Sequence, residues 1–100
     1  MISKKTLVLF LFVLAAFSAS AQFRLSLTFQ DATTKAPLEA VQAGLEGTGK
    51  TATTDANGLV EFNNLKAGRY ILLTRMVGYF PLRQEVNLRD NQTLTLPMET

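Results

Sequence analysis

The sequence predicts an all-β fold, an antiparallel β-sandwich of about seven short strands, preceded by a signal helix that is cleaved on export. Apolar and polar residues alternate with a period of two in several segments after residue 22. Gly, Asn, Asp or Pro separate these segments at intervals of roughly 8–12 residues. No segment after residue 21 has the helical period. These observations favour a sandwich over a mixed fold.

The first 21 residues have the three parts of a signal peptide. Lys4 and Lys5 precede an apolar run from Leu7 to Phe17, and small residues follow up to Ala21. The run has about 11 residues, whereas a helix needs about 20 to cross a bilayer. We therefore expect cleavage after Ala21, export to the periplasm or outer membrane, and a mature chain that begins at Gln22 without a membrane span.

Residues 22–100 suit one domain. The signal segment holds two of the ten basic residues and none of the eight acidic ones, so the mature chain has a net charge near zero. Its Lys and Arg residues are scattered, which excludes a nucleic-acid partner. The chain has no cysteine, so it lacks both a lipid attachment site and disulfides. Sheet packing or a larger assembly must stabilise the domain.

The alternation predicts each strand in turn. Residues 23–29 form a half-buried strand, and residues 41–45 form a second one, in which Gly44 predicts a bulge or a close approach. The threonine-rich residues 50–54 suit an edge strand. Residues 69–76 carry apolar side chains on both faces and are the best candidate for a central strand. Strands near 60–62, 84–88 and 94–98 complete the set, with a tight connection expected at residues 63–68.

Four segments also resemble the carboxypeptidase-regulatory-like domain in order and spacing: KAPLEAV (35–41), TDANGLVEF (54–62), LKAGRYIL (65–72) and VGY (77–79). Each has a physical reason. Asp55 and Gly58 suit a hairpin turn, because Asp bonds its own backbone and Gly adopts positive φ. The residues of this motif are Pro37, Leu38, Asp55, Gly58, Leu65, Gly68, Tyr70 and Gly78. Alternation and resemblance together predict a core that includes Leu27, Val41, Phe62, Leu65, Tyr70, Leu72, Val86 and Leu96.

The resemblance implies a transthyretin-like Greek-key sandwich. It also implies a relation to the periplasmic N-terminal domain of SusC/RagA-type TonB-dependent outer-membrane transporters. Their plug and barrel have no counterpart in these 100 residues. We therefore expect either a free-standing exported module or a truncated transporter.

The residue types argue against an enzyme. Histidine and cysteine are absent and Ser26 is the only serine after the signal segment, so serine, cysteine and histidine-metal catalysis are excluded. We expect no cofactor. The segment 55–58 overlaps the start of a calcium loop but lacks its other acids, so a plain turn is favoured. Glu39 and Glu46 are better interpreted as surface acids than as a glycosidase pair, and the sequon at Asn91 as a polar turn.

Ile71 and Leu73 occupy positions that the alternation places outside the core, and the aromatic residues Tyr79 and Phe80 lie in a predicted loop beside them. One interpretation is that the second sheet or the loops cover them; the other is one exposed patch that docks a protein. We expect a non-enzymatic interaction or structural module of the cell envelope, whose partner is an envelope protein. The alternative is a carbohydrate-binding-like module, which the absence of Trp disfavours because sugar rings stack on aromatic side chains.

Overall fold

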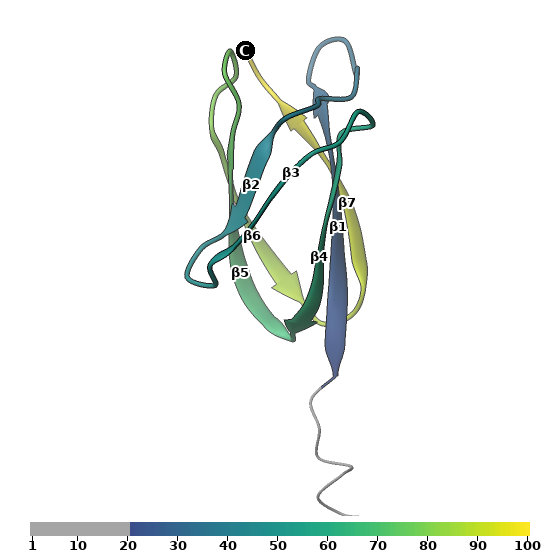
Figure 1. Ribbon diagram of the computed structural model, residues 1–100, viewed down its shortest axis with the longest axis vertical. Helices are drawn as coiled ribbons and strands as arrows, with labels where there is room; N and C mark the ends of the chain where they lie inside the picture. The colour runs from purple at the N-terminus through teal and green to yellow at the C-terminus, as the bar shows by residue number, and fades with distance from the viewer. Residues whose placement is uncertain (1–20) are drawn as a thin grey trace, which may run out of the picture.

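The computed structural model describes residues 21–100, so the signal segment lies outside the described part except for Ala21. Seven strands form two layers (Figure 1). They are β1 (Gln22–Asp31), β2 (Gln42–Leu45), β3 (Lys50–Thr53), β4 (Leu59–Lys66), β5 (Gly68–Arg75), β6 (Leu82–Leu88) and β7 (Gln92–Met98). A search of residues 21–100 finds no helix with the length and hydrophobicity to span a membrane.

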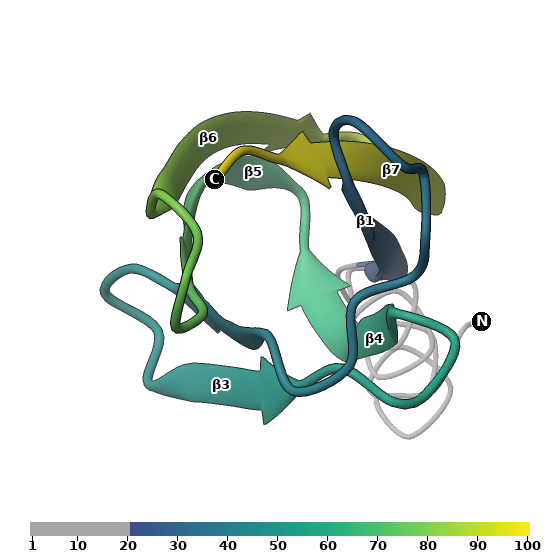
Figure 2. The ribbon, with the colours of Figure 1, turned by 90° about the horizontal axis from the view of Figure 1, so that it is seen from above.

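The strands form two sheets, with the orders β4-β1-β7 and β3-β2-β5-β6. This confirms the predicted sandwich, the edge position of β3 and the internal position of β5. One pair departs from the antiparallel prediction, because β1 and β7 run parallel. The chain leaves β6 in one sheet and enters β7 in the other, so no hairpin ties β7 to an antiparallel neighbour. Figure 2 shows the strands from above, and the buried side chains of both sheets form one core cluster.

The core holds most of the residues predicted for it. Six of the eight are buried: Leu27, Val41, Phe62, Leu65, Leu72 and Val86. Tyr70 and Leu96 are only half-buried and pack against the cluster. Tyr70 lies near the start of β5, where its hydroxyl donates a hydrogen bond of 2.6 Å to the Lys66 carbonyl. Leu96 lies on an edge strand, which leaves one of its sides open.

A β-bulge explains how Phe62 and Leu65 both reach the core. Residues three apart on a regular strand face opposite sides. The register between β1 and β4 shifts so that Phe23 pairs with Leu65 and Leu25 with Phe62. The extra residue in β4 restores the inward direction of Leu65, and Asn64 adopts a φ of 58°. The tight connection expected at residues 63–68 is therefore wrong, since β4 continues to Lys66 and only Ala67 separates it from β5.

Candidate functional site

The turn at residues 55–58 is fixed to strand β1. Asp55 Oδ1 accepts hydrogen bonds from the N–H groups of Asn57 (2.9 Å) and Leu59 (3.0 Å). The Phe29 N–H donates to the Gly58 carbonyl at 2.8 Å. Gly58 has a φ of 75°, and a Cβ there would lie 2.4 Å from the Phe29 carbonyl oxygen. Only glycine fits this position, and Asp55 and Gly58 together hold the turn against β1.

The other motif residues also have structural positions. Leu38 is buried and its N–H donates to the Phe29 carbonyl at 3.0 Å, beside the bridge between Gln30 and Pro37. Gly68 begins β5, and Gly78 lies in the loop between β5 and β6 with a φ of 88°. The motif therefore builds the sandwich and its turns.

The calcium-loop and glycosidase alternatives receive no support within residues 21–100. The oxygen Oδ1 of Asp55 is already bonded to two backbone N–H groups. No cluster of three or more potential metal-binding His, Cys, Asp or Glu residues occurs in this range. Glu39 and Glu46 are exposed, and Glu46 pairs with Arg83 at 3.8 Å. Ser26 donates its hydroxyl to Glu61 at 3.3 Å, which is a structural contact between β1 and β4.

The structure divides the four predicted docking residues between two places. Ile71 and Leu73 lie on β5, whereas Tyr79 and Phe80 lie in the loop between β5 and β6. Leu73 is 41% exposed and Phe80 is 67% exposed, whereas Ile71 and Tyr79 are half-buried. The exposed members are therefore Leu73 and Phe80.

Tyr79 makes contacts within the fold itself. Its ring packs against the core, and its hydroxyl donates to Asp31 Oδ2 at 2.8 Å. The other oxygen of Asp31 accepts the N–H groups of Thr33 and Thr34, both at 2.8 Å. These hydrogen bonds lower the pKa of Asp31, and the bond from the Thr34 N–H has the largest effect. The hydrogen bond between Tyr79 and Asp31 also raises the pKa of Tyr79.

A hollow of about 780 Å³ opens on the outer face of the four-stranded sheet. Gly44 lies at its centre, because the strand registers pair Gly44 with Thr51 of β3 and with Leu73 of β5. Most of its lining residues are exposed, such as Thr51, Leu73 and Arg83, and the buried Ala43 and Thr74 border it from within the same strands. Of the two features predicted at Gly44, the bulge is absent, since β2 pairs in regular register on both sides. The close approach is present, because a Cβ at Gly44 would lie 3.3 Å from Thr51 Cγ2.

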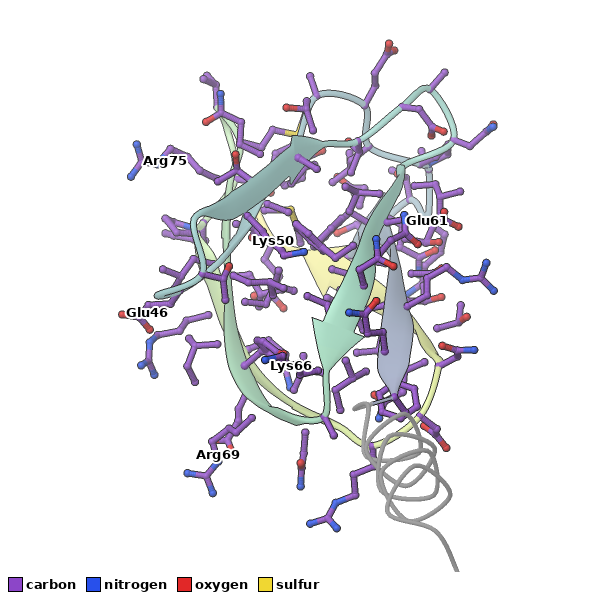
Figure 3. All side chains as sticks on the ribbon, turned by 60° about the horizontal axis from the view of Figure 1, so that its bottom comes forward. Glu46, Lys50, Glu61, Lys66, Arg69 and Arg75 are labelled. Atoms are coloured by element: carbon purple, nitrogen blue, oxygen red, sulfur yellow. The ribbon has the colours of Figure 1, made fainter. Side chains whose placement is uncertain are left out.

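The hollow combines an apolar centre with basic sides. Leu73, Arg75 and Arg83 all line it, and no acidic residue does. Arg83 pairs with Glu46, but within residues 21–100 no carboxylate forms an ion pair with Arg75. Figure 3 shows Arg75 projecting away from the body of the molecule. Sequence reasoning missed Gly44, Arg75 and Arg83 as one site, because strand pairing alone brings them together.

The hollow does not suit the stacking of a sugar ring. None of its lining residues is aromatic. Tyr70 and Tyr79 are half-buried, and their hydroxyls bond to Lys66 and Asp31. The lining of the hollow therefore offers no ring on which a sugar could stack, and the exposed aromatic residue near it is Phe80.

Comparison with known families agrees with the motif. Residues 28–100 match the family described as the CarboxypepD_reg-like domain. The chain belongs to this family. The domain is a β-sandwich, and the match extends from within β1 to the end of β7. The resemblance found in the four sequence segments is thereby confirmed.

Solved structures share the fold of this CarboxypepD_reg-like domain at low sequence identity. A group B streptococcus pilus 2b backbone protein has a TM-score of 0.63 at 22% identity over 76% of this chain and 40% of its own. A putative membrane-associated protein of unknown function from Bacteroides fragilis has a TM-score of 0.63 at 24% identity, over 82% of this chain and 29% of its own. This chain thus spans less than half of either protein.

A third solved structure is a cohesin–X-dockerin complex from Acetivibrio cellulolyticus, with a TM-score of 0.63 at 23% identity. The similarity covers 77% of this chain and 56% of the matched chain. That structure is a complex between proteins, which is a property of that assembly. No curated protein matches this chain.

Proposed function

We propose that this chain is a non-enzymatic interaction module of the cell envelope, and that it docks a protein partner through the outer face of the four-stranded sheet. The hollow centred on Gly44 carries this proposal. It is wide enough for a partner side chain, and it presents the exposed Leu73 next to the unpaired Arg75. Hot spots in protein interfaces commonly combine an apolar pocket with arginine.

The chemistry of the hollow favours one kind of partner segment. An apolar side chain would cover Leu73, and an acidic side chain beside it would pair with Arg75 or Arg83. Phe80 precedes Pro81, which lines the hollow, so Phe80 would contribute apolar area at its rim. Ile71, next to Leu73 but half-buried, would contribute less.

The family supports the wider assignment. CarboxypepD_reg-like domains are β-sandwiches, and the similar solved structures include a pilus protein and a cohesin–dockerin complex. We place the chain with the N-terminal domains of TonB-dependent transporters, exported and held in the periplasm or at the outer membrane. The leader predicted at residues 1–21 supports export. Mass spectrometry of the envelope fraction should then find a chain that begins at Gln22; an intact Met1 terminus in the cytoplasm would contradict export.

A binding experiment tests the docking surface. The tagged wild-type chain, expressed in its own host and cross-linked in the envelope, should capture a discrete partner. Leu73→Ser and Arg75→Glu should each reduce the captured amount at least about tenfold, because a buried apolar or charged contact contributes about 1.4 kcal/mol or more. Arg89→Glu is the matched control, since Arg89 is an exposed arginine that does not line the hollow. Equal capture by all variants would exclude this surface.

A further inference from the structure

The outward edge of β7 can be assigned residue by residue. β7 is the outer strand of its sheet and pairs only with β1 within the described residues. The Met98 carbonyl accepts the Ala32 N–H at 2.9 Å, so the backbone groups of Met98 point toward the β1 side. Successive residues of a strand direct these groups to alternate sides. Leu94 and Leu96 therefore also point toward β1, whereas Thr93, Thr95 and Pro97 point away.

One further contact and the position of Pro97 agree with this assignment. Glu99 lies two residues after Pro97, so its backbone groups point to the same side, away from β1. Its carbonyl accepts a hydrogen bond of 2.8 Å from the N–H of Phe80, which lies in the loop between β5 and β6. Proline is tolerated in a sheet where its missing N–H would face away from the neighbouring strand. The open edge thus offers the N–H groups of Thr93 and Thr95 and the carbonyls of Thr93, Thr95 and Pro97.

This edge lacks the charges that protect the other edges. Edge strands of folded proteins commonly carry charged residues that discourage pairing with another chain. β3 contains Lys50, β4 contains Glu61 and Lys66, and β6 contains Arg83 and Glu85. The seven residues of β7, QTLTLPM, include no charge. β7 is therefore the edge without charge among residues 21–100, and Pro97 interrupts only its C-terminal end.

We propose that β7 pairs with β7 of a second copy of this chain, antiparallel about a two-fold axis. An axis at Leu94 places Thr93 opposite Thr95 of the partner subunit. Each threonine then donates and accepts one bond, which gives about four backbone hydrogen bonds, none of which requires an N–H from Pro97. The exposed threonine side chains would lie opposite each other, a favourable cross-strand pair.

The composition of the domain favours this occupant. The uncharged edge presents no like charges to an identical strand. Residues 22–100 hold equal numbers of basic and acidic residues, so two copies carry no net repulsion. Pairing would join two three-stranded sheets into one continuous sheet. The interface is separate from the hollow, which lies on the other sheet.

Sedimentation of the purified chain over a concentration series tests the proposal. The wild-type chain and Thr95→Val should form a reversible dimer. Thr95→Pro should weaken dimerisation at least about tenfold, because each copy loses one outward donor, while the bonds to β1 stay intact. A wild-type chain that stays monomeric at about 100 μM, or a Thr95→Pro variant that dimerises normally, would overturn the proposal.

Two further measurements keep the test decisive. Should Thr95→Pro fail to fold, a Thr93→Lys, Thr95→Lys double variant introduces like charges at the edge and should also be monomeric. Hydrogen exchange adds a local readout, since the Thr93 and Thr95 amides should exchange fast in dilute monomer and slowly in the dimer. Leu73→Ser should dimerise like the wild type, so a failure of the docking proposal would not be mistaken for a failure of this one.

Discussion

The hydroxyl of Tyr79 donates a hydrogen bond of 2.8 Å to Asp31 Oδ2 and thereby joins the loop between β5 and β6 to the end of β1. The two residues lie 48 positions apart: Asp31 ends β1 of one sheet, and Tyr79 lies in the loop that joins β5 and β6 of the other. Asp31 also accepts two backbone N–H groups of its own turn. One carboxylate thus orders a turn and holds a long loop, and both roles depend on its ionisation.

The first prediction concerns acid stability. The N–H of Thr34, then Tyr79 and the N–H of Thr33, lower the pKa of Asp31 in the folded state. A lowered pKa contributes stability that is present above the unfolded value of about 3.9 and is lost as the pH falls through the folded value. Thermal melts between about pH 2 and pH 6 should therefore show a smaller acid-induced loss for Asp31→Asn than for the wild type. Asp90→Asn, at an exposed turn, should behave like the wild type; an identical acid profile for all three would contradict the role of Asp31.

The second prediction concerns the partner in this bond. The hydrogen bond to Asp31 raises the pKa of Tyr79, so the neutral phenol is favoured in the folded state. The stability that this hydrogen bond contributes is fully present below the unfolded pKa of about 10. It is lost as the pH rises through the higher pKa of the folded state. The difference between the tyrosinate absorbance titrations of the wild type and Tyr79→Phe should have its midpoint above about pH 10. A midpoint at or below that value would exclude a persistent bond.

The third prediction compares two glycines with positive φ. Gly58→Ala would place a Cβ 2.4 Å from the Phe29 carbonyl oxygen, whereas a Cβ at Gly47 meets nothing within 4 Å. Gly47→Ala should lower the free energy of unfolding by about 1 kcal/mol, the cost of a left-handed conformation. Gly58→Ala should cost about 3 kcal/mol or more, because β1 must shift. Urea denaturation measures the free energy of unfolding of both variants. An equal loss in the two would show that the turn does not pack tightly against β1.

The fourth prediction concerns Tyr70, which is half-buried and not central in the core. Tyr70→Ala should cost about 2 kcal/mol, below the 3–5 kcal/mol typical of a fully buried aromatic residue. Tyr70→Phe keeps the ring and loses only the 2.6 Å bond to the Lys66 carbonyl, so it should cost about 0.5–1 kcal/mol. Chemical denaturation of the two variants separates packing from hydrogen bonding. A loss with Tyr70→Phe as large as that with Tyr70→Ala would assign the effect to the hydroxyl.

The fifth prediction concerns a buried hydroxyl. Thr54 Oγ1 donates to the Leu38 carbonyl at 2.6 Å and accepts the Val41 N–H at 2.9 Å. Thr54→Val preserves the shape but leaves both backbone groups without this partner, which should cost about 2 kcal/mol. Thr53→Val is the matched control, because Thr53 is exposed, and its melting temperature should be nearly unchanged. Similar melting temperatures for the two variants would show that water replaces the hydroxyl.

Alternation by itself determined the strands and most of the core, because the direction of a side chain on a strand depends only on its position along that strand. Residues such as Leu27, Leu72 and Val86 could be assigned to the core in this way. The turn at Asp55 and Gly58 was equally local, since both residues act on backbone groups within a few positions. The order of four short segments was sufficient to indicate the family, although each segment alone is common.

The tertiary structure decided what depends on pairing between distant segments. The parallel contact of β7 with β1, the bulge that turns Leu65 inward and the bond from Tyr79 to Asp31 all join residues far apart in the sequence. The hollow exists because the registers of three strands place Gly44 between Thr51 and Leu73. A one-residue change in the first register would move Thr51 away from Gly44, and one in the second would move Leu73 away. Neither change alters the alternation of any strand, so the sequence pattern alone contained no information on this surface.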